Sequence, residues 1–507
     1  MQTKILKVTL WGIEVGKLKW EHSQMRGIFS YNPDFVKRGL DIAPLTASIH
    51  KGYGKGENVV GVPMRRQNKF TGLPVFIADS LPDAWGKKLM KTWVSEYGTE
   101  QRALTPLDFL AYTGKRGMGA LEFEPDNSPW NQDMDVNLGN MFRLAEKIFR
   151  QKEDVSLLPE EEWDMAALCS LGTSAGGMQP KAIIAQNMDS GIIRSGQILH
   201  EGDWKYYLLK FAHPENQWQC EMEMAWYRMA QEAGIQMMPS SLMEFEGRKH
   251  FLTERFDRVG GDKVHLQTLG AMNPDAVSYE DIMEVCDELR LPYKEKEEMF
   301  RRMVFNVLAG CTDDHNRNFS FMMSKDGKWH ITPAYDLTFT VSIENGYIEG
   351  DEHELTVRGK CIDISEKDFL LFALENDIKN ASRIIAEVKN AVAHVYDFLV
   401  EQGVNDDYAQ SIADYLTGGE KRSIAVERRN HRISDVVIYN EGKSIRCKID
   451  GVQQLGRRIS LKDQIDIQKM LKNNRPFDFD VFAKELACKY YNKDLDMNAS
   501  LGKGLKQ

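Results

Sequence analysis

The sequence predicts an α+β protein in which strand-rich segments come first and helices follow. Residues 4–18 alternate between apolar and polar side chains, which is typical of a strand hairpin, and residues 165–258 are predicted to form strands around one helix. Beyond residue 275, apolar residues recur at helical spacing. The composition, 42% hydrophobic and 28% charged, is that of a globular protein and excludes collagen-like, coiled-coil and wholly disordered chains.

The length of 507 residues and the changes in composition indicate three units. Because residues 126–137 are polar and lack periodicity, we place the first domain at 1–135. We expect the second domain at 136–419, with strands to about residue 260 and helices after it. Residues 420–507 form a basic C-terminal extension, with 19 Lys and Arg against 12 Asp and Glu, although the whole chain has a formal net charge of −10. Such interspersed charges usually form a solvated surface, and the extension has no assigned role.

In the first domain, the hairpin at 4–18 turns at its glycines. A helix is expected after Ser80, which is a suitable N-cap, because Pro82 then falls in the first helical turn. Residues 105–124 are predicted to form a helix followed by a strand.

In the second domain, a glycine-rich turn leads into a strand, and a further strand covers 204–212. A helix over 219–233 ends at Gly234, a residue that favours helix C-termini, and another strand covers 250–258. The elements expected after it are a helix at 298–309, a polar loop, a hairpin built on Asp326-Gly327 and a long helical region through about residue 404.

The cysteine pattern and the N-terminal residues indicate a soluble, cytoplasmic protein. The seven cysteines are scattered and never form a CxxC pair, which suits a reducing compartment. Charged residues interrupt the apolar positions of the N-terminus, so no signal peptide is expected, and no apolar run is long enough to cross a bilayer.

Four segments carry residue types that suit phosphoryl transfer, in the order found in kinases. The first is the glycine-rich turn, whose backbone N–H groups can hold phosphates. The second is Lys210, a lone charge in an apolar strand, with which Glu221 or Glu223 of the next helix could pair. Each feature alone has an ordinary explanation, as a plain turn or as a lysine that reaches water at a strand edge.

The third segment, the polar loop from Asp313 to Asn318, is the most informative. An Asp followed five residues later by an Asn is the spacing of a kinase catalytic loop, where the Asp takes the hydroxyl proton and the Asn binds magnesium. The fourth is Tyr335-Asp336, whose carboxylate can supply a second magnesium ligand. Asp and Asn also favour plain turns, but together the four segments predict phosphoryl transfer from Mg-ATP.

Other chemistries lack their characteristic residues in this sequence. His315 and Cys311 have no neighbouring His or Cys pair that would complete a zinc site. No GxSxG motif marks a serine hydrolase, and no GxGxxG motif within a βαβ unit marks a dinucleotide-binding fold.

With these motifs the chain resembles the HipA-type toxin serine/threonine kinases, the partners of bacterial HipB-type antitoxins. The resemblance covers roughly residues 4–400 and leaves out the C-terminal extension. Its most specific motifs are Glu254-Arg255-Phe256-Asp257-Arg258 and the Asp313–Asn318 loop. The other matching segments are Gly12–Gly16, Phe29–Pro33, Ser80–Gly86, Gly117–Leu121, Ser174–Lys181 and Pro333–Asp336.

The resemblance implies a two-lobed, protein-kinase-like fold preceded by a small N-terminal α+β subdomain. It implies catalytic roles for Asp313, His315 and Asn318, with Asp313 as the base, and it assigns Mg²⁺ to Asn318 and Asp336. The nucleotide-binding residues that it implies are Ser174, Ala175, Gly176, Gly177, Met178, Gln179, Lys181, Lys210, Glu254, Arg255, Phe256, Asp257, His315, Asn316, Arg317, Asn318, Tyr335 and Asp336.

Some of these roles are more specific, and Asp314 and Pro180 depart from the family pattern. Glu254 and Phe256 would bind adenine through their backbone, and Asp257 could reach the ribose. Ser174 would be a site of autophosphorylation, since a phosphate of about −2 charge there would repel ATP, although it could also be a plain turn hydroxyl. Asp314 stands where the family commonly has Gly, so the identity of the base stays open between two carboxylates.

We therefore expect a Mg-ATP-dependent serine/threonine protein kinase of HipA toxin type that acts on a cellular protein, with ATP and Mg²⁺ as cofactors. The partner that the family implies is a HipB-like DNA-binding antitoxin, because the chain shows no DNA-binding motif of its own. Two alternatives are a non-catalytic corepressor in an antitoxin–DNA complex and a small-molecule kinase of related fold. The four intact site residues disfavour the first alternative, and the N-terminal subdomain disfavours the second.

Overall fold

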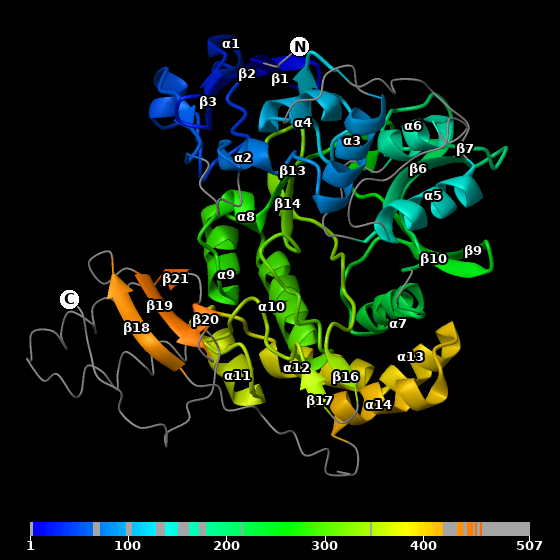
Figure 1. Ribbon diagram of the computed structural model, residues 1–507. Helices are drawn as coiled ribbons and strands as arrows, with labels where there is room; N and C mark the ends of the chain where they lie inside the picture. Colours follow the sequence, from blue (N-terminus) through cyan, green and yellow to red (C-terminus); the bar gives the residue numbers. More distant parts are fainter. Residues whose placement is uncertain are drawn as a thin grey trace, which may run out of the picture.

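The computed structural model has two antiparallel sheets and several helices in its upper half, above a lower half that is mostly helical (Figure 1). It describes residues 4–63, 71–97, 104–127, 137–150, 162–171, 179–213, 216–344 and 347–418, and four strand segments between 433 and 458. The domain boundaries expected near residues 135 and 419 fall at the edges of these ranges, among residues that are not described, and they stay predictions. Within the described ranges, no helix is both long and apolar enough to span a membrane.

The N-terminal sheet has the strand order β4-β3-β2-β1-β5. The expected hairpin is present as β1 (Ile5–Leu10) and β2 (Ile13–Glu21), joined by a tight turn in which Gly12 has a φ of 76°. Gly16 lies where β2 passes close to β3, since a Cβ there would stand 2.2 Å from the Ser30 carbonyl oxygen. The other elements of this part are β3 (Arg26–Tyr31), α1 (Pro33–Val36), the 3-10 helix η1 (Gly52–Lys55), β4 (Val59–Val60), α2 (Val75–Ala78), α3 (Ala84–Tyr97), α4 (Pro106–Thr113) and β5 (Leu121–Glu124).

The helix expected after Ser80 begins later than predicted, at Ala84. Asp83 caps it in place of Ser80, because Asp83 Oδ1 accepts a hydrogen bond from the Gly86 N–H at 2.7 Å. The other carboxylate oxygen of Asp83 faces Lys181 of the second sheet, whose Nζ is 3.3 Å away.

The second sheet has the order β7-β6-β8-β10-β9. The strand with the lone lysine is β8 (Trp204–Lys210), and Lys210 lies opposite Lys181, the first residue of β6 (Lys181–Asn187). The predicted helix after β8 is confirmed within one residue as α7 (Gln219–Glu232). The remaining elements of this part are α5 (Leu138–Arg150), α6 (Glu162–Leu171), β7 (Ile193–Ser195), β9 (Ser240–Phe245) and β10 (Arg248–Glu254).

The lower half is built around α10 (Tyr293–Leu308), which matches the helix expected at 298–309 and buries the predicted apolar face. The hairpin at Asp326-Gly327 is also confirmed. The long helical region expected after it is wrong in its first part, since residues 342–349 form another hairpin and Gly350 interrupts the stretch with a φ of 77°. The other elements between residues 258 and 417 are β11 (Arg258–Val259), β12 (Asp262–Lys263), β13 (His265–Thr268), α8 (Leu269–Met272), α9 (Tyr279–Glu288), β14 (Ser320–Met323), β15 (Trp329–Ile331), β16 (Ser342–Glu344), β17 (Tyr347–Glu349), α11 (Glu366–Glu375), α12 (Ala381–Ala393), α13 (Val395–Gln402) and α14 (Asp406–Thr417).

Two large hydrophobic cores hold the described parts together. The larger core runs from the N-terminal sheet, with Leu6 and Phe29, to the lower helices, with Phe300 and Val388. The smaller core joins Trp85 of α3 to α5, α6 and the second sheet. The N-terminal part, from β1 to β5, therefore packs both on the lower helices and on the second sheet. The predicted α+β class is confirmed. In the C-terminal extension, β18 (Ile433–Tyr439), β19 (Ser444–Ile449), β20 (Val452–Gln453) and β21 (Arg457–Arg458) form a separate sheet.

Candidate active site

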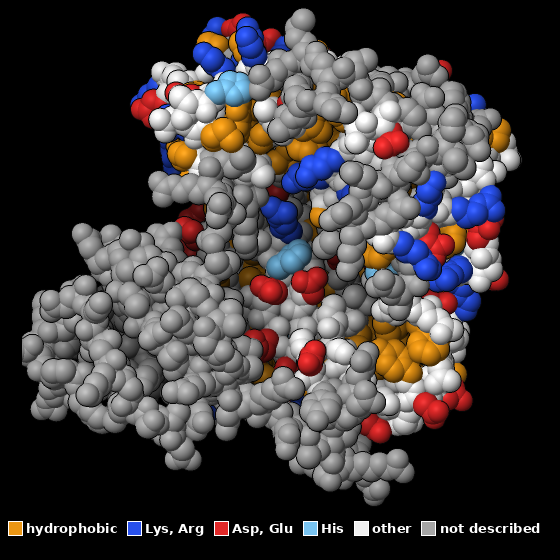
Figure 2. All heavy atoms as spheres, in the orientation of Figure 1, with side chains coloured by type: hydrophobic (Ala, Val, Ile, Leu, Met, Phe, Trp, Pro, Cys, Tyr) orange, Lys and Arg blue, Asp and Glu red, His pale blue; other side chains and the backbone are white. Residues whose placement is uncertain are grey.

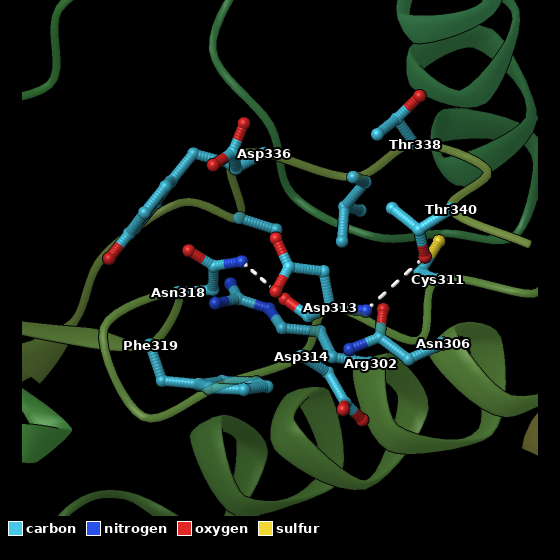
Figure 3. Close-up of a pocket in the computed structure, with 13 residues that line it drawn as sticks. Arg302, Asn306, Cys311, Asp313, Asp314, Asn318, Phe319, Asp336, Thr338 and Thr340 are labelled. Atoms are coloured by element: carbon cyan, nitrogen blue, oxygen red, sulfur yellow. Dashed lines mark hydrogen bonds between the residues drawn. The ribbon is translucent and has the colours of Figure 1, made fainter. Parts of the chain in front are cut away.

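A pocket opens at the C-terminal end of α10, where the loop that begins at Asp313 meets the segment around Asp336 (Figure 3). On this face of the molecule, Lys and Arg side chains lie above a hollow and Asp and Glu side chains lie below it (Figure 2). The residues that line the pocket are Arg302, Asn306, Cys311, Asp313, Asp314, Asn318, Phe319, Ala334, Tyr335, Asp336, Leu337, Thr338 and Thr340.

The two adjacent carboxylates, Asp313 and Asp314, have different surroundings. Asp313 is exposed, and its N–H donates to Thr340 Oγ1 at 3.2 Å. Asp314 is buried, and its Oδ2 accepts from the Tyr279 hydroxyl at 2.6 Å and lies 2.9 Å from Nδ1 of His353. Because its hydrogen-bonding capacity is used inside the protein, Asp314 supports the loop, and Asp313 is the carboxylate that a substrate could reach.

The environment of Asp313 suits a proton acceptor. Although the residue is exposed, neighbouring protein atoms partly desolvate its carboxyl and raise its pKa, and the charge of His315 offsets part of that rise. The carboxylates of Asp336 and Glu354 raise the pKa further. A general base works best when its pKa lies close to the working pH, so a raised carboxyl pKa favours this role.

Lys210 lies between two carboxylates from different parts of the fold. Its Nζ is 2.6 Å from Glu223 Oε1 of α7, and it also contacts Asp336 Oδ1. Burial alone would lower the pKa of Lys210, but Asp336 and Glu223 outweigh burial and raise it above its usual value. The lysine is therefore a fixed ammonium group beside the pocket, and Glu223, not Glu221, is its helix partner.

Asp336 completes this arrangement. Burial would raise its pKa, but the ammonium groups of Lys210 and Lys181 outweigh burial and hold the pKa below its usual value. Its φ of 58° places it in the left-handed region, which is uncommon for residues other than glycine and recurs at functional sites. The carboxylate is thus ionised and its backbone is held in a costly conformation.

Asn318 and Asp336 fit a magnesium ion by their chemistry. Asn318 Nδ2 donates to the Asp313 carbonyl oxygen at 2.7 Å, which leaves its amide oxygen free of that contact (Figure 3). The Asp336 side chain is 36% exposed. Two such oxygen donors match the way Mg²⁺ is usually held, with water and substrate phosphates as the other ligands. The described residues contain no group of three or more His, Cys, Asp or Glu that could form a complete metal cage.

The remaining residues of the catalytic loop are tied to their neighbours. His315 Nδ1 accepts from the Arg317 N–H at 3.3 Å, and the Arg317 carbonyl accepts from the Tyr335 hydroxyl at 2.7 Å. The Asn316 carbonyl accepts from the Gly270 N–H at 2.9 Å, so Asn316 anchors the loop to α8. These contacts connect the loop to the Tyr335-Asp336 segment.

The residues expected to bind adenine and ribose differ in whether a nucleotide could reach them. The Glu254 N–H already donates to the Pro239 carbonyl oxygen, within the protein. Phe256 lies against Tyr335 of the pocket, with ring centroids 5.7 Å apart, so Phe256 borders the pocket. The ribose contact expected of Asp257 does not agree with the structure, because the Asp257 side chain is completely buried between Arg255 and Arg258. Arg255 is likewise buried, and its guanidinium group donates to Asp257 and to the Gly196 carbonyl oxygen.

The glycine-rich turn can be placed only at its end. Ser174, Ala175, Gly176, Gly177 and Met178 lie outside the described residues, so their predicted roles stay predictions. The turn leads into β6 through Gln179, whose Nε2 donates to the Phe211 carbonyl at 3.0 Å, and Lys181 follows as a buried residue.

Three residues near the site were not predicted from the sequence. Thr340 Oγ1 accepts hydrogen bonds from the Thr312 and Asp313 N–H groups at 2.7 and 3.2 Å, which fixes the start of the loop. His353 and Tyr279 hold Asp314. No local motif marks them, because they reach the loop from distant parts of the chain.

Comparisons with known proteins agree with this fold. A family model for the HipA N-terminal domain matches residues 6–124, and a model for the HipA-like C-terminal domain matches residues 173–396, together more than half of the chain. A serine/threonine-protein kinase toxin HipA of Shewanella oneidensis is 21% identical over 463 residues, which cover 82% of this chain and 94% of that protein.

One further sequence relative and one solved structure also match this chain. A Haemophilus influenzae protein that is provisionally named a kinase is 28% identical over 210 residues, and the match spans 37% of this chain and only 56% of that protein. A solved complex of HipA, HipB and operator DNA from Shewanella oneidensis resembles this chain with a TM-score of 0.52 at 18% identity. That match covers 81% of this chain and 95% of the other, and it shows a shared fold.

Proposed function

Because the chain belongs to the HipA family of toxin kinases, we propose that it is a protein kinase that transfers the γ-phosphoryl group of ATP to a serine or threonine hydroxyl. The observation that carries the proposal is the convergence of Asp313, Asn318 and Asp336 on one pocket, with Lys210 paired to both Glu223 and Asp336. Such a site positions phosphates and a hydroxyl for in-line transfer.

In the proposed reaction Asp313 accepts the proton of the acceptor hydroxyl as its oxygen attacks the γ-phosphorus. The bond between the γ-phosphorus and its bridging oxygen breaks, and ADP leaves with the negative charge. Lys210 stabilises that charge as a fixed cation, since its two carboxylate partners keep it protonated. Asn318 and Asp336 would hold Mg²⁺, which supplies further neutralisation of the phosphates when bound.

The regulatory and binding roles that the family suggests are part of the same proposal. Ser174 is proposed as a site of autophosphorylation, where the added charge would repel ATP. A HipB-like antitoxin is the proposed partner, because the solved HipA that this chain resembles is in complex with HipB and operator DNA. A cellular protein is the proposed substrate, and the cytoplasm is the proposed location.

The two adjacent aspartates provide the test. Asp313→Asn should reduce phosphoryl transfer by about 10²–10⁴-fold without changing the melting temperature, because it removes the base from an exposed position. Asp314→Asn should lower the melting temperature, because it weakens the acceptor of a buried hydrogen-bond network. Both variants are incubated with Mg-ATP, and phosphate on Ser174 and on added protein is measured by mass.

Two results would contradict parts of this proposal. Equal phosphorylation in the wild-type protein and the Asp313→Asn variant would remove Asp313 from the role of base. Tight ATP binding with no transfer to any protein would favour a non-catalytic corepressor or a small-molecule kinase.

A further inference from the structure

A carboxylate of the N-terminal part reaches into the nucleotide side of the fold. Asp83 Oδ2 lies 3.3 Å from Lys181 Nζ, and the two side chains are only 7% and 3% exposed. In the same place the Trp85 Nε1 donates to the Lys181 carbonyl oxygen at 3.2 Å. The residues that begin α3 therefore hold both the side chain and the main chain of Lys181, at the start of β6.

The position of Lys181 in the sheet places its ammonium group next to another positive charge, which a nearby carboxylate can offset. It lies directly opposite Lys210 in the pairing of β6 with β8, and like charges in facing positions repel each other. Glu223 and Asp336 contact Lys210, whereas Asp83 contacts Lys181. Burial and Lys210 lower the pKa of Lys181, and Asp83 and Asp336 oppose that change. The Asp83 carboxylate thus helps to keep a second buried ammonium group charged beside the first.

We propose that Asp83 is a positioning residue of the nucleotide site, which holds the Lys181 ammonium beside Lys210 so that both cations act on ATP phosphates. The inference rests on the proposed function, since it assumes that ATP binds beside these lysines. It adds that the N-terminal part supplies a side chain to the site, so the packing of this part on β6 contributes to ATP affinity.

The two oxygens of Asp83 allow a clean substitution. Oδ1 caps α3 through the Gly86 N–H, and Oδ2 faces Lys181. Asp83→Asn keeps an oxygen for the cap, because Asn is as good an N-cap as Asp, but it removes the charge from Lys181. Asp83→Ser, which also caps a helix, serves as a second variant if the first one folds poorly.

A matched control comes from another ion pair across the same junction. Glu122 Oε1 of β5 lies 2.7 Å from Lys263 Nζ of β12, with side chains 18% and 9% exposed. Glu122→Gln therefore removes a similar charge from the contact between the N-terminal part and the rest, away from the two site lysines. This control separates a specific effect on ATP binding from a general weakening of the contact between the N-terminal part and the rest.

The experiment measures Mg-ATP binding to the full chain by calorimetry, together with KM and kcat of phosphoryl transfer. We expect Asp83→Asn to weaken Mg-ATP binding about tenfold and to raise KM more than it lowers kcat, whereas Glu122→Gln changes binding by less than about twofold. In a Lys181→Met background, Asp83→Asn should have no further effect, because Asp83 acts through Lys181.

Unchanged or tighter Mg-ATP binding by Asp83→Asn would overturn the inference, since the carboxylate would then be irrelevant to ATP or in competition with it. An equal loss of binding in the wild-type and Lys181→Met backgrounds would also overturn it, because the effect would not pass through Lys181. If the wild-type protein itself bound no Mg-ATP, the proposed function would fail. If the wild-type protein bound Mg-ATP and Asp83→Asn bound it equally well, the inference alone would fail.

Discussion

At the scale of single residues, Glu223 is one of the two carboxylates that keep Lys210 charged, with Asp336 as the other. It is one of two acidic residues near the start of α7, but only its carboxylate reaches Lys210, at 2.6 Å, and it is buried there. Glu221 is half-buried on the same helix. The choice between them follows from the direction in which the helix presents each side chain to β8.

We expect Glu223→Gln to weaken phosphoryl transfer and Glu221→Gln to leave it nearly unchanged. Loss of a buried carboxylate partner costs about 3–5 kcal/mol in the worst case, which is enough to displace Lys210 from the phosphates. Steady-state assays at saturating and limiting Mg-ATP give kcat and KM for both variants. Equal activity of the Glu223→Gln variant and the wild-type protein would show that Asp336 alone holds the lysine.

Residues of the site were predictable from the sequence where the signal is local. Asp313 and Asn318 stand five positions apart in one loop, and the structure brings them to the same pocket. Asp257 could not be judged in this way, because its Oδ2 accepts from the Gly119 N–H, 138 residues away in the chain. The local spacing of a motif does not show whether a distant segment buries one of its residues. For this reason the sequence suggested a ribose contact for Asp257 that its burial does not allow.

At the scale of elements, β13 joins the N-terminal part to the hairpin built on Asp326-Gly327. Its first residue, His265, is fully buried, with Nε2 3.0 Å from the Ile42 carbonyl oxygen and its ring edge-on to Trp329. Burial lowers the pKa of His265 to about 4. The neutral imidazole is therefore part of this packing, and its protonation is incompatible with it.

Acid should weaken this packing in a defined pH window. The unfolded chain takes up a proton on His265 below pH of about 6.5, whereas the folded protein does not until pH falls to about 4. Stability from this group is thus complete above the unfolded pKa and is lost as pH falls, by roughly 2 kcal/mol at pH 5. His265→Gln, which can still donate to the Ile42 carbonyl, should lose less stability between pH 7 and pH 5 in denaturant unfolding. An identical loss in both proteins would exclude His265 as the source.

Among whole elements, those with strong periodicity or turn signals were predicted well, as α10 and the Asp326-Gly327 hairpin show. The region at 342–349 was assigned to a helix, but it pairs with itself as β16 and β17. The start of α3 was also misplaced, because Asp83 caps it and Ser80 does not. Both errors arise where a short local preference is outweighed by contacts with the rest of the fold.

At the scale of the whole molecule, a buried ion network joins the N-terminal part to the rest. Asp257 accepts from Arg255 Nε at 2.8 Å, from Arg258 at 2.8 Å and from the Gly119 N–H at 2.8 Å. Arg258 also donates to the Gly117 carbonyl oxygen at 3.1 Å. Burial would raise the pKa of Asp257, but the two guanidinium groups outweigh it and hold the pKa well below its usual value.

Asp257→Asn should therefore lower the stability of the whole molecule without changing its preference between nucleotides. Removal of the charge leaves two buried arginines without their carboxylate, which costs about 3–5 kcal/mol, so the melting temperature should fall and limited proteolysis near the junction should accelerate. The ratio of affinities for ATP and 2′-deoxy-ATP should stay the same, because the buried carboxylate cannot reach a ribose hydroxyl. If the variant kept its stability but lost the preference for ATP over 2′-deoxy-ATP, Asp257 would have to contact the ribose. The contact between the N-terminal part and the rest would then have to open when nucleotide binds.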